Sequence, residues 1–156
     1  MDLFDEPLLH GEPLVLGVVG IHTTITKEEI HETILHPLVS VLGRLPDKMI
    51  LPAEGMSSAY LSIWAERNRI DAQAVKADWT KFQRKAGILR DARILKEATH
   101  LLVFVGPKSR RYEQTAIQQC KKGKRVFLVE PNPVDMIEIV VESHLPPDNN
   151  AREQTR

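Results

Sequence analysis

The chain has 156 residues, of which 42% are hydrophobic and 27% charged, and its 21 basic residues are balanced by 21 acidic ones. This length suits one domain with a proper core and is too short for two ordinary domains. A net charge of zero gives no overall field for nucleic acid or membrane, so electrostatic recognition must depend on local clusters. The single cysteine, Cys120, excludes an internal disulfide and a cysteine-rich zinc site.

The same features indicate where the protein works. One lone thiol is typical of a reducing compartment. No apolar run reaches the roughly 20 residues of a membrane span, and residues 1–6 lack the basic start of a signal peptide. We therefore expect a cytoplasmic protein with no membrane partner. We expect a single Rossmann-like domain over residues 1–145, and a disordered tail over residues 146–156.

Short apolar runs alternate with amphipathic segments along the chain. The apolar runs predict strands buried on both faces, at residues 14–19, 48–52, 70–75, 101–105 and 125–129. A first helix is expected over residues 27–42, because Thr26 and Glu29 form a capping box. Pro37 should kink or break it near His36, since proline removes a helical hydrogen bond.

Three further segments follow the later strands. Ser57 or Ser58 is expected to cap a second helix, with Tyr60 and Trp64 packed onto the sheet. A third helix should run to about residue 98 and a fourth over residues 113–122. Their inward stripes are predicted as Ile88, Ala92 and Leu95 in the third and Ala116, Ile117 and Cys120 in the fourth. Residues 134–141 fit a helix and a strand almost equally well.

This alternation predicts an α/β fold, a Rossmann-like three-layer sandwich with a central, mostly parallel sheet of about five strands. Ligands of such sheets bind outside the carboxyl ends of the strands, where loops and helix N-termini converge. The run from Gly17 to Gly20 lacks the third glycine of the dinucleotide fingerprint, which argues against a Rossmann dehydrogenase.

The basic turn after the strand at residues 101–105 is the strongest candidate site. It combines a glycine, three cations, a hydroxyl and an aromatic ring, in Gly106, Lys108, Ser109, Arg110, Arg111 and Tyr112. Glycine permits close backbone approach, and helix N–H groups and cations attract anions. The turn therefore predicts a phosphate cradle, although a solvated basic turn has the same composition. Arg90 fits a phosphate ligand across the cleft, an ordinary surface arginine, or the partner of a nearby carboxylate.

Other polar residues follow neighbouring strands and are expected to line the same crevice. Gly20 and His22 follow the first strand, and Glu54, Gly55 and Ser57 the second. Asp78 and Trp79 fit contacts to a sugar hydroxyl and a base, or else they only terminate the third strand. Glu113 fits a nucleophile or acid/base group, or a carboxylate that stabilises the helix dipole. The histidines show no metal-ligand spacing, and we expect neither a metal nor a cofactor.

Three motifs carry a family resemblance. Asp78 and Trp79, followed by Ala86-Gly87-Ile88-Leu89-Arg90-Asp91, resemble a D-W-x(n)-A-G-x-x-R-N segment, with Asp91 in place of asparagine. Residues 106–112 resemble a G-K-S-K-G-T turn, and residues 54–59 a worn G-G-A-x-G-A-D loop. These motifs resemble those of the SLOG superfamily of Rossmann-like nucleotide-binding proteins, in particular its YspA-like branch.

The resemblance implies a nucleotide or nucleotide-derived ligand and a homo-oligomer. Because the superfamily includes phosphoribohydrolases that use an arginine and a glutamate, it also implies an alternative: an N-glycosidase with Arg90 and Glu113 as catalytic residues. The pair Tyr112-Glu113 is similar to the aromatic-glutamate pair of nucleoside deoxyribosyltransferases. A third alternative is a DprA-like module that binds single-stranded DNA or protein, suggested by the cations over residues 121–125. Arg111 and Tyr112 stand where the branch has glycine and threonine, so we expect a bulkier turn.

Overall fold

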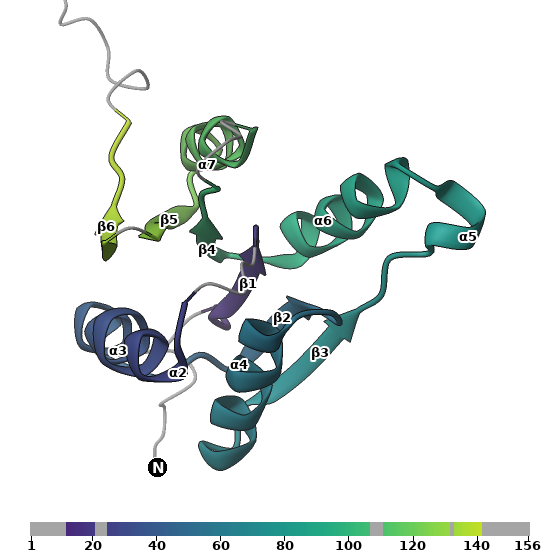
Figure 1. Cartoon of the computed structure of the whole chain (residues 1–156). Coiled ribbons are helices and arrows are strands. Elements are labelled where there is room, and N and C mark those ends of the chain that lie inside the picture. Colours follow the sequence, from purple (N-terminus) through teal and green to yellow (C-terminus); the bar gives the residue numbers. More distant parts are fainter. Residues whose placement is uncertain (1–11, 21–24, 107–110, 132, 142–156) are drawn as a thin grey trace, which may run out of the picture.

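A computed structural model describes residues 12–20, 25–106, 111–131 and 133–141 of the chain (Figure 1). These residues form a six-stranded sheet in the order β3-β2-β1-β4-β5-β6. Its strands are β1 (Val15–Val19), β2 (Lys48–Pro52), β3 (Asp71–Val75), β4 (His100–Phe104), β5 (Arg125–Pro131) and β6 (Val134–Glu138). β1 to β5 run parallel, and β6 pairs antiparallel with β5. The predicted fold class is therefore confirmed: a Rossmann-like three-layer α/β sandwich.

Helices cover both faces of the sheet, because alternate residues of its buried strands point to opposite sides. α2 (Lys27–Glu29), the π-helical segment η1 (Ile30–Leu35), α3 (His36–Leu42) and α4 (Met56–Arg67) share one core with one face. α6 (Lys85–Glu97) and α7 (Arg111–Lys121) share a second core with the other face. No helix within the described ranges has the length and apolar character needed to cross a membrane.

The first predicted helix continues past Pro37 instead of breaking. Thr26 and Glu29 form the expected capping box, and the N–H of His36 bonds to the carbonyl oxygen of His31, five residues back. Pro37 has no N–H, and its ring crowds the carbonyl four residues earlier. The wider π turns before it accommodate both defects, so the chain stays helical to residue 42.

Two other local predictions were wrong, and one open alternative is decided by the structure. Gly55, not a serine, occupies the N-cap of α4, where it has φ 99° and no side-chain cap bond, while Ser57 and Ser58 are buried inside the first turn. The loop around Trp79 contains a short helix, α5 (Trp79–Phe82), which the side chain of Asp78 caps. Residues 134–138 are a strand, which adds a sixth, antiparallel member to the sheet.

The inward faces of α6 and α7 are only partly as predicted: Leu95 and Cys120 pack against the core, but other residues differ. Ile88 is 53% exposed, and Ala86, Asp91 and Ile94 are the buried residues of α6. Asp91 is buried on the inward side of α6 because it has hydrogen-bond partners there. The apolar pattern had predicted that Ile88 would lie on this side. In α7, Ala116 is buried as predicted and Gln119 is buried beside it, whereas Ile117 is exposed.

Candidate functional site

The strand order reverses between β1 and β4, and this is where open α/β sheets bind ligands. Gly20 follows β1 and has φ +77°, a left-handed conformation that glycine adopts without strain. A Cβ atom at Gly20 would come within 2.1 Å of the Phe104 carbonyl oxygen and 3.2 Å of Cγ of Tyr112. The end of β1, the end of β4 and the start of α7 are therefore in close contact here.

Asp91 is the centre of the polar network at this edge. Its side chain is only 5% exposed and receives bonds from residues of both α6 and α7. Oδ1 accepts from Nε of Arg90 at 3.2 Å, and Oδ2 accepts from Nη2 of Arg111 at 3.0 Å and from the Tyr112 hydroxyl at 2.6 Å. A buried carboxylate is tolerated when it is paired and hydrogen-bonded. These bonds lock α6 to α7 across the switch point.

Glu54 extends the network toward the outer strands. One of its oxygens accepts from Nη1 of Arg90 at 2.8 Å, and the other accepts from the indole N–H of Trp79 at 2.7 Å. The loop after β2, α5 and α6 are joined in this way. The prediction that Glu54, Trp79 and Arg90 lie in one place therefore agrees with the geometry. Asp78 is directed to its own helix, where it accepts from the N–H of Lys81 at 3.1 Å.

Tyr112 is held as a neutral hydrogen-bond donor. Burial, followed by its hydrogen bond to Asp91, raises the pKa of Tyr112 to about 12. The guanidinium of Arg111 lies 4.6 Å from the centroid of the Tyr112 ring, within the range of a cation–π contact. The phenol therefore donates to Asp91 over the whole physiological pH range while its ring supports Arg111.

The two arginines of the network differ in exposure. The side chain of Arg90 is 13% exposed and lies between the carboxylates of Glu54 and Asp91. The side chain of Arg111 is 46% exposed, at the first turn of α7. Arg90 thus pairs with nearby carboxylates, one of its sequence-based interpretations. Arg111 also pairs with Asp91, but it is more exposed and lies at the N-terminus of α7.

Glu113 is not brought to this network. It lines a separate groove of about 550 Å³ between α7 and the β5–β6 pair, together with Ile117, Leu128 and Ile137. Gly106 lies two residues after the end of β4. Four predicted ligand residues lie outside the described residues: His22, Lys108, Ser109 and Arg110.

Asp91 and its role were missed by the sequence reasoning. The available signal was its place beside Arg90 at the end of the A-G-x-x-R-N-like segment, where we noted only the replacement of asparagine. Within the described ranges, no group of three or more His, Cys, Asp or Glu side chains is placed to hold a metal ion.

No family model matches the sequence, and no curated protein or solved structure matches it. The fold defines the protein as a Rossmann-like α/β domain with a buried, doubly arginine-paired aspartate at its switch point. The functional argument therefore depends on this geometry.

Proposed function

We propose that the protein binds a nucleotide or nucleotide-derived ligand in the crevice at the carboxyl ends of β1 and β4. One observation carries the proposal: Arg90 and Arg111, from separate helices, meet at the buried carboxylate of Asp91 beside Gly20. Asp91 fixes the position of the half-exposed Arg111 guanidinium, and guanidinium groups match phosphate oxygens in bidentate contacts. The switch point of the strand order supports the same location.

These residues would have different roles in binding the ligand. Arg111 and the N-terminal N–H groups of α7 would hold the phosphate, helped by the predicted ligands Lys108, Ser109 and Arg110. Arg90 acts as a positioning residue, because both sides of its guanidinium are engaged by carboxylates. Trp79, which is 50% exposed, supplies an indole face for stacking a base while Glu54 fixes its orientation.

Calorimetric titration with AMP, ADP-ribose and adenosine tests this proposal. Both phosphate-bearing ligands should bind, and adenosine should bind at least about tenfold more weakly, because a charge-assisted phosphate contact contributes about 1.5–3 kcal/mol. Arg111→Gln should weaken AMP binding by a similar factor, whereas the control Arg93→Gln, on an exposed part of α6, should not. Equal affinity for AMP and adenosine, or no binding of either phosphate, would contradict the proposal.

The N-glycosidase alternative gains no support from the position of Glu113 in a separate groove. It stays a prediction with its own test. Release of free base from a nucleoside monophosphate, abolished in Glu113→Gln, would favour it over simple binding. Intact ligand recovered after prolonged incubation would remove it.

A further inference from the structure

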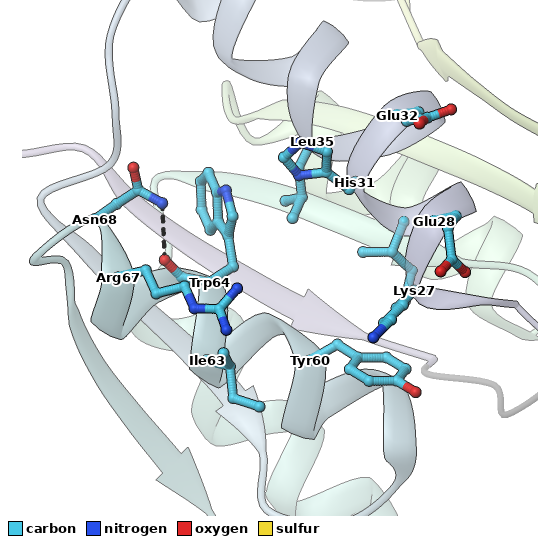
Figure 2. A pocket seen from close by; sticks show the side chains of 11 residues that line it. Lys27, Glu28, His31, Glu32, Leu35, Tyr60, Ile63, Trp64, Arg67 and Asn68 are labelled. Carbon is cyan, nitrogen blue, oxygen red and sulfur yellow. Dashed lines mark hydrogen bonds between the residues drawn. The ribbon is translucent and has the colours of Figure 1, made fainter.

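A second cavity lies on the opposite face of the sheet from α6 and Asp91, between η1 and α4 (Figure 2). Its volume is about 540 Å³, within the range of sites for small molecules. The lining residues come from α2, η1 and α4 with the residue after it: Lys27, Glu28, Ile30, His31, Glu32, Leu35, Tyr60, Ile63, Trp64, Arg67 and Asn68.

Several polar side chains that line this cavity have no hydrogen-bond partner among the described residues. In the part of the chain that the structure describes, the side chains of Lys27, His31, Tyr60 and Arg67 make no hydrogen bond or ion pair. The indole N–H of Trp64 has none either, although the Trp64 carbonyl oxygen accepts from Asn68 at 2.8 Å. Several donors around one hollow are therefore available to a ligand.

The charged side chains around the cavity point in different directions. Figure 2 shows Lys27 and Arg67 reaching into the space between the two helical walls, from opposite sides. The carboxylates of Glu28 and Glu32 point away from Trp64, on the outer side of their helix. Glu28 and Glu32 also line the cavity, so its charges balance, and an anion is favoured only between Lys27 and Arg67, beside the two rings.

Aromatic surface completes the cavity. Tyr60 and Trp64 are half-buried, pack against the core and leave part of each ring at the cavity wall. Rings of this kind bind flat aromatic groups by offset or edge-to-face contact. The opposite wall is η1, whose π turns depart from regular helix at His31 and Leu35, and such turns are frequent at functional sites.

We propose that this cavity is a binding site for a small aromatic carboxylate. The ring lies against Trp64 and Tyr60, and the carboxylate accepts from the guanidinium of Arg67 and the ammonium of Lys27. Arginine provides the paired donors that match a carboxylate, which an uncharged amide cannot replace. This site is separate from the proposed nucleotide site at the ends of β1 and β4. The proposal for the cavity does not depend on nucleotide binding there.

Heteronuclear NMR can follow the two indole N–H signals of the protein, one from Trp64 and one from Trp79. The Trp79→Phe variant assigns them, because it leaves Trp64 as the lone tryptophan. Titration with 4-hydroxybenzoate should shift the Trp64 signal to saturation. The matched amide, 4-hydroxybenzamide, should bind at least about tenfold more weakly, as expected for the loss of a charge-assisted bond.

Variants separate this site from a general surface effect. Arg67→Gln should lower the affinity for the carboxylate toward that for the amide, and Arg93→Gln should leave it unchanged. Equal binding of acid and amide, or no saturable shift of Trp64, overturns the proposal. A Trp64 signal that moves only with protein concentration also overturns it, because a second copy of the chain would then cover the cavity.

Discussion

Asp91 keeps a buried negative charge because three donors surround it. Removing one partner from such a group is costly, since the remaining charge is left under-compensated in a medium of low polarity. Arg90, Arg111 and Tyr112 therefore stabilise the fold through their bonds to Asp91. All three side chains are positioned by their bonds to Asp91. The sequence pattern had predicted apolar residues on the inward side of α6, where Asp91 lies.

Tyr112→Phe should destabilise the protein by about 1.5–3 kcal/mol, the usual cost of losing a hydrogen bond to a charged group. Urea unfolding at neutral pH measures it. The pKa of Tyr112 is raised from 10.0 to about 12 in the folded state, so its stabilising effect is complete below pH 10 and declines as pH rises toward 12. The difference in the free energy of unfolding between wild type and Tyr112→Phe should therefore shrink as the pH rises from 10 to about 12.

The control for this change is Tyr60→Phe. The Tyr60 hydroxyl has no hydrogen-bond partner among the described residues, so its removal should alter the free energy of unfolding by less than about 0.5 kcal/mol. Equal losses for the two variants, or a gap that persists unchanged to pH 12, would contradict the role given to Asp91 and Tyr112.

Gly20→Ala should cost at least about 2 kcal/mol, because the new methyl meets the Phe104 carbonyl oxygen and the backbone is left-handed. Gly43→Ala measures the cost of the left-handed backbone alone. Gly43 has φ +76° but nothing within 4 Å of its Cβ position, so about 1 kcal/mol is expected there. Thermal unfolding of both variants gives the comparison, and equal losses would show that β1 and β4 do not meet tightly at this point.

Among the elements, α6 shows why part of the site escaped prediction from sequence. The existence and order of the buried strands, and the capping box at Thr26, follow from local pattern and were predicted closely. The rotation of α6 was not, because it depends on Asp91 reaching Arg111 and Tyr112 twenty residues later in the chain. The grouping of Glu54, Trp79 and Arg90 was predicted, since their loops follow neighbouring parallel strands.

β6 is tied to the sheet by a paired salt bridge. Arg125 donates from Nε and Nη2 to the two carboxylate oxygens of Glu138, at 2.7 and 2.8 Å. Glu138→Gln should cost about 0.5–1 kcal/mol, because the pair is partly exposed. Glu130→Gln, on an exposed residue of β5, is the control and should cost less.

The pH dependence of this pair has a defined sign. The hydrogen bond from Arg125, the largest of several causes, lowers the pKa of Glu138 below its usual value of 4.5. Its stabilising effect is therefore present above pH 4.5 and is lost as the pH falls below that value. Urea unfolding of wild type and Glu138→Gln between pH 7 and pH 3 should give curves that converge on the acid side, and parallel curves would contradict it.

The whole molecule separates two candidate sites by the layers of its fold. The candidate nucleotide site lies at the ends of β1 and β4, at one edge of the sheet, where α6 and α7 begin (Figure 1). The aromatic cavity lies between η1 and α4, on one face of the sheet. The switch point between β1 and β4 follows from the predicted alternation of strands and helices, whereas a ligand crevice there stays a prediction. The cavity was not predicted, because it depends on how two helices far apart in sequence pack and on the π turns before Pro37.

Two predictions concern the partners of the whole molecule: a second copy of the chain, and single-stranded DNA. The homo-oligomer stays a prediction, and sedimentation over a range of protein concentrations measures it. The single-stranded DNA alternative predicts binding that weakens steeply with salt. If the protein does not bind DNA, or binds it with an affinity independent of salt, the DNA alternative is excluded and nucleotide binding stays the leading hypothesis.

The most direct test of that hypothesis is an NMR titration with ADP-ribose that follows the backbone amides of the whole chain. We expect saturable shifts at Gly20, Gly106 and Arg111, with the Trp64 indole signal unmoved. Shifts confined to the cavity between η1 and α4, or no saturable shift at the ends of β1 and β4 with any phosphate-bearing nucleotide, would contradict the proposal that this crevice binds nucleotides.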